Sequence, residues 1–428
     1  MSTATPRAHR PAALLRAAAA LVAALVASGA AAEPPREAAA IARVFPSFAR
    51  VPRVVLVANP SPLQPLGALE QRVRGAPAGG WLWVKRDDVS AGLVGGNKAR
   101  KLEFLLAQAQ STGARGVLTS GRLGTNLGLA TAMAARRLGL RTTVVLAPQP
   151  VSESVRRKLL ALHAAGAEMR VHSTMAGAIF DVVWLRLKAA LQPAQRLYYI
   201  PPSGTSEVGS LGYVNAFFEL LDQTGDEHLP DEIVVASSTG GTAAGLLAGM
   251  CLSGRWERTR IRAVAVTDGW LQSEWLLRRE ARDAFRAVRD SLDPADRARA
   301  PECDFMGTRS ALTYVRGYLT PGYGRGDAEL DGVMRLARET QGLELDVTFS
   351  AKAMRHFLDR ARERLRTGDT RRPLLFWNTY APVDLESMIA AHPWTEPRAP
   401  WRDLPEAFHP MFKPSGETRT AAALPAKR

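Results

Sequence analysis

The stretch that decides the fold of this chain is Trp81-Leu-Trp-Val-Lys-Arg-Asp-Asp88, continued by Gly95-Gly-Asn-Lys98 and Ala99-Arg-Lys-Leu-Glu-Phe-Leu-Leu106. The alternation of apolar and polar residues in its first part predicts a strand, and the glycines that follow break that strand. Leucines then recur at helical spacing. We therefore expect a helix with Asn97 as its N-cap and Lys98 as its first residue.

The first turn of this predicted helix carries an unusual charge. Lys98, Arg100 and Lys101 crowd where the partial positive charge of a helix N-terminus would favour carboxylates. Either these side chains reach solvent, or they surround an anion while the crowding lowers the pKa of one lysine. A neutral lysine beside an anion site is what a Schiff-base enzyme with pyridoxal phosphate requires, since only the free amine attacks a carbonyl.

The strings Lys85-Arg-Asp-Asp88 and Gly95-Gly-Asn-Lys-Ala-Arg-Lys-Leu-Glu103 resemble the pyridoxal-phosphate lysine segment of the D-cysteine desulfhydrase and 1-aminocyclopropane-1-carboxylate (ACC) deaminase family. That family belongs to the tryptophan-synthase-β-like, or fold-type-II, pyridoxal-phosphate enzymes. The resemblance implies an α/β fold with two open, twisted, mostly parallel sheets flanked by helices. It also implies that pyridoxal 5′-phosphate is the cofactor, with Lys98 as the Schiff-base lysine and Lys101 as a phosphate contact.

Composition excludes several classes of protein. The 428 residues suffice for two domains that share a large core, and the hydrophobic (46%) and charged (23%) contents are ordinary globular values. The net charge is +15, but no Lys/Arg run is interleaved with aromatic residues, so a solvated basic surface is favoured over a nucleic-acid site. The seven histidines lack metal-ligand spacing, and no metal is expected. Cys251 and Cys303 form no framework, although one disulfide stays open.

The two ends of the chain differ in composition from the middle. Arginines precede an apolar run at residues 17–27, and Ala30-Ala-Ala32 fits a signal-peptidase site. We expect a signal peptide at residues 1–32 and a periplasmic or secreted protein; the alternative is a disordered extension on a cytoplasmic one. The apolar run is too short for a membrane span. Residues 397–428 are rich in Pro, Arg, Ala and Thr, which predicts a flexible tail.

Between these ends, strand-like and helix-like segments alternate. They lie at residues 116–120, 127–138, 142–146, 152–165, 168–171 and 176–191, and this alternation predicts a parallel sheet with helices on both faces. Residues 198–215 resemble the return crossing of the family from its small domain to its large one. We therefore expect a small domain at 101–208 inserted into a large domain at 41–100 and 209–396, with the site between them at the strands' carboxyl ends.

A second motif follows the apolar stretch at residues 232–236. The run Ser237-Ser-Thr-Gly-Gly-Thr-Ala-Ala-Gly-Leu-Leu247 predicts a turn and a helix whose N–H groups can hold a phosphate, although glycine-rich turns also serve close packing. It resembles the family's Ser-Gly-Gly-Thr-x-Ala-Gly loop, with Thr239 in place of the serine. The resemblance assigns the phosphate to Ser238, Thr239, Gly240, Gly241 and Thr242. A Walker-type site is excluded because no Gly-Lys-Ser/Thr follows.

Three positions depart from the family pattern. Gly124-Thr-Asn-Leu127 replaces Gln-Ser-Asn-His, Phe349 replaces a tyrosine, and Asn378-Thr-Tyr-Ala381 replaces His-Thr-Gly-Gly. Thr125 can still donate to a substrate carboxylate and Asn126 can still bond the 3′ oxygen of the cofactor, whereas Leu127 can do neither. Thr379 is expected to face the pyridine nitrogen. Tyr323, in Thr320-Pro-Gly-Tyr-Gly324, matches a family tyrosine near the cofactor; the alternative is a turn residue packed on the core.

The resemblance implies a lyase or deaminase that acts on a small amino acid. The expected reaction is β-elimination from an internal aldimine on Lys98, giving sulfide, ammonia and pyruvate as in D-cysteine desulfhydrase, with Thr125 and Tyr323 as further catalytic residues. Loss of polar substrate contacts also leaves open a catalytically impaired binder of pyridoxal phosphate or amino acids, an ACC deaminase or a racemase. We expect a homodimer by analogy with the family, no nucleic-acid partner, and no membrane span after signal cleavage.

Overall fold

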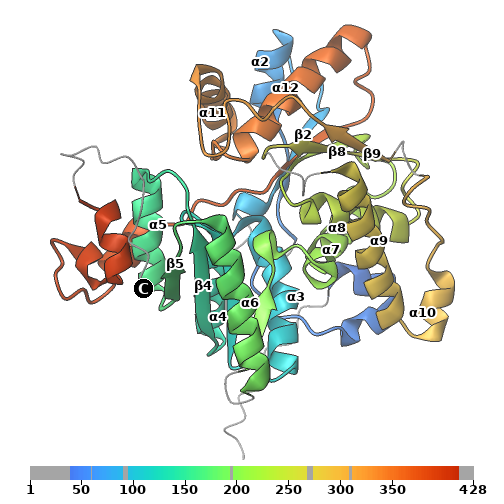
Figure 1. The fold of residues 1–428 in the computed structure, drawn as a ribbon. Coiled ribbons are helices and arrows are strands. Elements are labelled where there is room, and N and C mark those ends of the chain that lie inside the picture. Colours follow the sequence, from blue (N-terminus) through green and yellow to red (C-terminus); the bar gives the residue numbers. More distant parts are fainter. Residues whose placement is uncertain are drawn as a thin grey trace, which may run out of the picture. The chain divides into compact units, whose positions relative to one another are not determined.

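The computed structural model describes residues 39–58, 60–89, 95–192, 196–267, 273–307 and 311–413. The predicted signal peptide therefore lies outside the described residues, as do residues 414–428 of the predicted tail. The described chain contains two β-sheets, each flanked by helices (Figure 1), which confirms the predicted fold class.

The larger sheet has six strands in the order β1-β2-β10-β7-β8-β9. Every neighbouring pair is parallel except β1 and β2. The central strands are apolar because both of their faces are covered by helices. The strands are β1 (Leu63–Pro65), β2 (Leu82–Arg86), β7 (Glu232–Ser237), β8 (Arg260–Ala265), β9 (Leu312–Val315) and β10 (Leu374–Asn378).

Alternate residues of this sheet point to two different helical layers. Ile233 and Val235 pack with α7 (Glu207–Thr224), α8 (Gly241–Leu252) and α9 (Glu274–Ser291). Val234, between them, packs on the opposite face with α2 (Gly67–Arg74), α11 (Ala328–Gln341) and α12 (Ser350–Thr367). This alternation follows from the two-residue period of a strand.

The smaller sheet has four parallel strands in the order β5-β4-β3-β6. They are β3 (Gly116–Arg122), β4 (Arg141–Ala147), β5 (Glu168–Val171) and β6 (Leu197–Ile200). One face carries α3 (Gly96–Ser111), α4 (Asn126–Arg137) and α5 (Glu153–Ala164), and the other carries α6 (Met175–Leu191). All four strands lie within the predicted small-domain range, while the boundaries of the two domains stay a prediction.

The prediction of a flexible tail from residue 397 is wrong as far as the structure describes it. Leu404 and Phe408 are buried, and residues from 383 onward pack against the core between α4, α5 and the smaller sheet. This segment therefore packs against the core of the smaller sheet. Its elements are α13 (Leu385–Ala390) and the 3-10 helices η6 (Pro400–Asp403) and η7 (Glu406–Met411); the remaining short helices are α10 (Pro294–Arg299), η1 (Ala40–Arg43), η2 (Pro46–Arg50), η3 (Asp87–Val89) and η5 (Pro202–Gly204).

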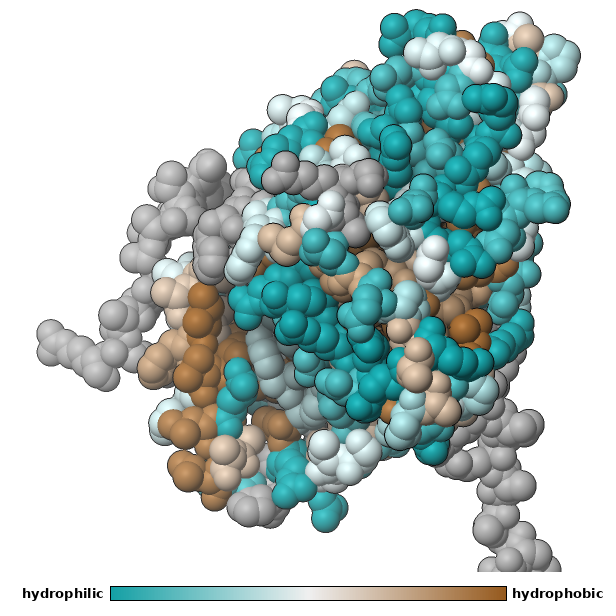
Figure 2. All heavy atoms as spheres, turned by 90° about the vertical axis from the view of Figure 1, so that its right-hand side faces the viewer, coloured by the Kyte–Doolittle hydropathy of each residue, from teal (hydrophilic) through white to brown (hydrophobic). Residues whose placement is uncertain are grey.

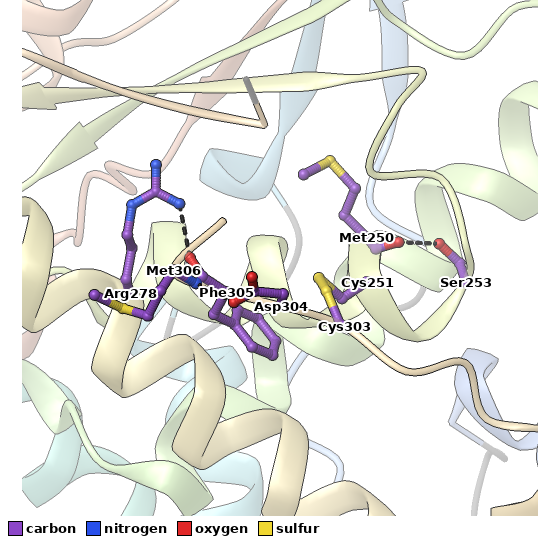
Figure 3. The surroundings of a disulfide bond; sticks show 8 residues. All are labelled: Met250, Cys251, Ser253, Arg278, Cys303, Asp304, Phe305 and Met306. Carbon is purple, nitrogen blue, oxygen red and sulfur yellow. Dashed lines mark hydrogen bonds between the residues drawn. A yellow bond between two sulfur atoms is a disulfide. The ribbon is translucent and has the colours of Figure 1, made fainter. Parts of the chain in front are cut away.

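A disulfide joins Cys251, near the end of α8, to Cys303 in the segment after α10 (Figure 3). Their Cα atoms are 5.9 Å apart, although the residues are separated by 52 positions in sequence. The segment is also held by Arg278 of α9, whose guanidinium donates a hydrogen bond to the carbonyl of Phe305 at 2.9 Å. The sequence left open a single disulfide between Cys251 and Cys303, and the structure contains this disulfide.

Removal of this disulfide is expected to lower the free energy of unfolding by about 4 kcal/mol, because the reduced unfolded chain regains the entropy of a loop of about 50 residues. Urea unfolding with and without dithiothreitol measures the effect. The Cys251→Ala/Cys303→Ala variant should unfold at the same urea concentration in both conditions. An oxidised wild type as unstable as this variant would contradict the prediction.

Within the residues that the structure describes, no helix is long and apolar enough to cross a bilayer.

Candidate active site

The helix that carries Lys98 begins two residues earlier than the sequence predicts. Gly95 is the N-cap of α3, so the assignment of Asn97 as N-cap is wrong. Gly96 has φ +71°, and a Cβ there would lie 2.5 Å from the carbonyl oxygen of Thr379, which explains the glycine. Asn97 instead connects elements: its N–H donates to the Thr379 carbonyl at 3.0 Å, and its Nδ2 donates to Thr242 Oγ1 at 3.1 Å.

Lys98 and Lys101 lie in the first turns of α3, and both amines are kept from full solvation. Burial lowers the pKa of Lys98 to about 8, against the opposing charge of Asp346. Burial, together with the charge of Lys98, holds the pKa of Lys101 well below its usual value. The Lys101 ammonium donates to the Ser203 carbonyl at 3.3 Å and to Thr205 Oγ1 at 3.4 Å. Neither lysine is the solvated side chain of the first alternative, and burial, more than the crowding of cations, lowers both pKa values.

Arg100 neither reaches solvent nor faces an anion site, so neither of the two predicted environments describes it. Its guanidinium is buried and forms ion pairs with Glu219 at 2.9 Å and with Asp87 at 2.8 Å. The same Glu219 also pairs with Lys85. Arg100 therefore anchors α3 to a buried network of two cations and two carboxylates instead of facing an anion site.

The predicted phosphate loop lies against this part of α3. Gly240 has φ +88°, and a Cβ at Gly241 would lie 2.6 Å from Thr205 Oγ1 and 2.8 Å from Lys101 Nζ. Thr205 Oγ1 is 2.6 Å from Thr239 Oγ1. Because Asn97 also reaches Thr242, the loop contacts the helix on both sides of Lys98 in sequence. The structure thus brings Gly241 and Thr242 to the lysine-bearing helix.

Two further residues that were predicted to bind the cofactor are Ser238, at the start of this loop, and Thr379. Ser238 Oγ accepts a hydrogen bond from Thr267 Oγ1 at 3.1 Å. Thr379 is buried at the end of β10, the strand between β2 and β7, and its carbonyl accepts the Asn97 N–H described above. The neighbouring Tyr380 is half-buried, and burial raises the pKa of its phenol.

Thr125 and Asn126 begin α4, beyond the carboxyl end of β3. Thr125 is the N-cap, and its Oγ1 accepts from the N–H of Gly128 at 3.1 Å. Asn126 Oδ1 accepts from the ammonium of Lys158 at 2.7 Å. Lys158 was not singled out in the sequence, where nothing in the charged first half of α5 distinguishes it. Leu127 is buried and packs in the core of the smaller sheet.

Tyr323 is half-buried and joins elements from both sheets. Its ring lies edge-on to Phe349, with centroids 5.9 Å apart, and the guanidinium of Arg122 at the end of β3 lies 5.2 Å from its centroid. Burial raises the pKa of its phenol. Lys352 fixes the turn directly before Tyr323, because its ammonium donates to the carbonyls of Leu319 and Gly322 at 2.7 and 2.6 Å.

Asp346 is the residue around which these groups converge, and it was missed. Its carboxylate accepts hydrogen bonds from the N–H groups of Thr348, Phe349 and Ser350. Its charge acts on the pKa values of four surrounding side chains, Lys98, Lys158, Tyr323 and Tyr380. The signal was the Leu345-Asp346 pair in the segment that also contains Phe349, which the sequence analysis used only for the missing tyrosine.

This arrangement fits pyridoxal phosphate. The glycine at position 241 leaves space beside the Lys101 ammonium, and a helix N-terminus with adjacent hydroxyl groups suits a phosphate. Lys98, with its lowered pKa, lies one turn away on α3. Among the described residues no group of His, Cys, Asp and Glu side chains could hold a metal ion.

Comparison with known proteins assigns the class. Residues 54–372 match the family model described as pyridoxal-phosphate dependent enzyme, and the chain therefore belongs to that family. It is 30% identical over 320 residues to a D-cysteine desulfhydrase of Klebsiella pneumoniae, covering 73% of this chain and 89% of that protein. It is 32% identical over 335 residues to a nocardicin C-9′ epimerase of Nocardia uniformis subsp. tsuyamanensis, covering 77% and 92%.

A solved structure of an ACC deaminase homologue aligns with a TM-score of 0.64 at 28% identity, covering 81% of this chain and 98% of that one. Within its family the protein is thus a member of the ACC deaminase and D-cysteine desulfhydrase group. This confirms the resemblance and the dependence on pyridoxal phosphate.

Uptake of the cofactor is expected to follow the ionisation of Lys98. With a pKa of about 8, the neutral fraction of its amine is about a tenth at pH 7, and it rises with pH until it levels off above the pKa. The rate at which cofactor-free protein binds pyridoxal phosphate should rise in the same way, as measured by stopped-flow absorbance. Asp346→Asn should move the midpoint to lower pH. A rate that still rises steeply above pH 10 would indicate an ordinary, solvated lysine instead.

Proposed function

We propose that this protein is a lyase that eliminates a β-leaving group from a small amino acid and releases ammonia and a keto acid. Its model reaction is that of D-cysteine desulfhydrase, which gives sulfide, ammonia and pyruvate. The observation that carries the proposal is the position of Lys98, whose amine has a pKa of about 8 and lies on the helix turn that contacts the phosphate loop. The relatives in the same group support the class of substrate.

Each side chain around Lys98 has a separate role in the proposed reaction. Pyridoxal phosphate, when bound, supplies an electron sink for a negative charge at the substrate α-carbon. Lys101 and the loop from Ser238 to Thr242 would hold its phosphate, and Asn126 and Thr379 would contact its ring. The Lys98 amine would hold the cofactor until the substrate amine displaces it. The freed lysine, whose pKa is lowered to about 8, would then take the α-proton as the base.

Tyr323 serves as the acid of the reaction. Because its pKa is raised by burial, the phenol keeps its proton and can donate it to the leaving group. Its position is held by the edge-on contact with Phe349 and by the Lys352-bound turn. The hydroxyl group of Thr125, beside Asn126, donates a hydrogen bond to the substrate, while its oxygen accepts from the Gly128 N–H and caps α4.

The test is an assay of the purified, cofactor-loaded protein with D-cysteine, L-cysteine and ACC. Sulfide and pyruvate from cysteine support elimination, and 2-oxobutyrate from ACC would support ring opening instead. The epimerase relative favours a second candidate, inversion at the α-carbon, which would appear as interconversion of D- and L-amino acids without keto acid. A protein that binds the cofactor but changes none of these substrates would contradict the proposal and favour a binding protein.

We further propose that the enzyme works outside the cytoplasm. The Cys251–Cys303 disulfide supports this location because disulfides persist in oxidising compartments and are rare in the cytosol. N-terminal sequencing of the protein from fractionated cells is the test. We expect a periplasmic or secreted protein that begins at Glu33, and a full-length protein in the cytosolic fraction would rule this out.

A further inference from the structure

Lys158 brings a positive charge to the site without an acidic partner among the described residues. Its ammonium donates to two neutral acceptors, Asn126 Oδ1 at 2.7 Å and the Gly124 carbonyl at 3.5 Å. Both acceptors belong to the stretch that precedes or opens α4. Lys158 is half-buried, and this burial lowers the pKa of its ammonium. A cation in this position is costly unless an anion joins it.

The lysine differs from its neighbours on α5 in direction. Arg156 donates to the Met411 carbonyl in the C-terminal segment, and Arg157 pairs with Glu153 and Glu386 on the exposed side. Lys158 alone of these three is directed to the start of α4. Helical spacing accounts for this, because successive residues point about 100° apart.

Asp346 does not neutralise Lys158. Its charge acts to raise the pKa of the lysine, but no ion pair joins the two among the described residues. Its oxygens are already occupied by the N–H groups of Thr348, Phe349 and Ser350 and by the Ser350 hydroxyl. The charge of Asp346 acts on the pKa values of both Lys98 and Lys158, and Lys158 contacts Asn126, the residue that is expected to face the cofactor.

We propose that Lys158 binds the carboxylate of the amino-acid substrate and so takes over a contact that the buried Leu127 cannot make. The inference rests on the proposed function, whose substrate it restricts to amino acids with a free carboxylate, as opposed to amides, esters or simple amines. Lys158 and Thr125 together provide an ammonium and a hydroxyl group for that carboxylate. Asn126 is positioned by the same lysine, because its Oδ1 is occupied and its NH₂ group is left to donate.

Alanine and alaninamide, each as D and L forms, are suitable probes because they have no β-leaving group. Their dissociation constants with the cofactor-loaded protein are measured by absorbance titration and by calorimetry. Wild type should bind one form of alanine about tenfold tighter than its amide, and Lys158→Met should weaken only alanine, by about tenfold. Lys158→Arg should restore most of the affinity. Lys413→Met, at an exposed position, is the matched control.

Equal binding of alanine and alaninamide by wild type, or an equal loss of both in Lys158→Met, would overturn the role of Lys158. Thermal unfolding of each variant shows whether the fold is kept, and Lys158→Gln replaces Lys158→Met if it is not. The outcome is separate from that of the proposed function. Elimination from cysteine can fail while alanine binding still depends on Lys158. Conversely, elimination can succeed while alanine binds equally well with or without Lys158.

An independent observation concerns the outer face of α6. Its inner face packs through Ala178 and Val182 on the smaller sheet. Its outer face exposes seven large apolar side chains, each between 45% and 74% accessible (Met175, Ile179, Phe180, Val183, Trp184, Leu187 and Leu191). Figure 2 shows a brown apolar area over this part of the molecule. These side chains amount to roughly 800 Å² of surface, which is the area that each partner buries in a standard protein interface.

We infer that the homodimer expected by analogy with the family uses this face, with α6 of one copy packed against α6 of the other. Met175, Ile179, Val183, Leu187 and Leu191 form one row at four-residue spacing, and Phe180 and Trp184 form an adjacent row. Two such rows with a groove between them are what packs against an identical helix. A twofold contact is also the commonest way in which identical subunits associate. The exposed face contains no acidic residue, since Asp181 is buried in an ion pair with Arg170.

Light scattering and sedimentation of the purified protein test this interface. Wild type should be a dimer at micromolar concentration, and Trp184→Glu/Leu187→Glu should be a folded monomer. Trp275→Glu is the matched control, since Trp275 is exposed to 54% on a different helix, and it should remain dimeric. A monomeric wild type, with or without binding to lipid vesicles, or a dimer that survives the double substitution would overturn the inference.

Discussion

Replacement of Lys98 by alanine should abolish turnover, with a loss of about a thousandfold or more, together with the absorbance of bound pyridoxal phosphate. The lysines nearest to it in the site are held by other acceptors, because Lys101 donates to Ser203 and Thr205, and Lys158 donates to Asn126. Lys85 and Lys352 donate to backbone carbonyls. Absorbance spectra and the cysteine assay on the same preparation measure the two effects. Circular dichroism shows whether the variant is folded.

Lys98→Arg separates charge from chemistry in this experiment. It keeps a cation beside Asp346 but lacks a nucleophilic amine, so it should be as inactive as Lys98→Ala. Lys413→Ala, an exposed lysine far along the chain, should behave as wild type. If Lys98→Ala retained a tenth of the activity or an unchanged spectrum, the assignment of Lys98 would be wrong.

Among single substitutions at charged residues, the largest expected effect on stability belongs to Glu219→Gln, with a loss of about 3–5 kcal/mol in the free energy of unfolding. Glu219 pairs with both Arg100 and Lys85, and all three are buried. Removal of its charge leaves a net positive charge in a region that water does not reach. Urea unfolding of the cofactor-free protein measures the loss without a contribution from ligand binding.

The charge of Glu219 also predicts a dependence on pH. Its pKa is lowered to about 2 in the folded protein, despite the opposing effect of burial, because Arg100 and Lys85 favour the carboxylate. A lowered pKa contributes stability that is present above the unfolded value near 4.5 and is lost as pH falls toward 2. Wild type should therefore lose about 3 kcal/mol more than Glu219→Gln over this interval.

Asp226→Asn is the matched control, because Asp226 forms an ion pair with Arg255 at the surface. Solvent screening should limit its effect to less than about 1 kcal/mol. If Glu219→Gln were as mild as Asp226→Asn, the buried network would not stabilise the position of α3.

Local patterns predicted the elements of the smaller sheet well. Strands at 142–146 and 168–171 and helices at 152–165 and 176–191 agree within two residues with β4, β5, α5 and α6. Hydrophobic periodicity is a property of the segment itself, so no distant partner is needed to recognise it. The same holds for Gly240 of the phosphate loop, because its positive φ is a property of the turn itself.

The predictions that failed depended on distant partners. Asn97 was assigned as a cap from its residue type, but Thr379 and Thr242, more than 140 positions away, determine its hydrogen bonds. Arg100 was grouped with the lysines because its carboxylate partner Glu219 could not be recognised from sequence. Lys158 looks like any charged residue of α5 until the fold places it beside Asn126.

The C-terminal segment from residue 397 was predicted to be flexible, and this prediction failed because its packing also depends on distant residues. Its composition is that of a mobile segment, and only Leu404 and Phe408 are buried in the packed part. Two apolar residues at four-residue spacing do not stand out against proline and arginine. Their burial depends on a surface formed by α4, α5 and α13, which no local pattern of the tail describes.

The most direct test of the central claim is borohydride reduction of the cofactor-loaded protein followed by mass mapping of its peptides. Reduction fixes pyridoxal phosphate to the lysine that holds it. The account predicts one modified peptide, with the added mass on Lys98. Modification of Lys101 or Lys158 instead, or no modified peptide in protein shown to contain the cofactor, would contradict it.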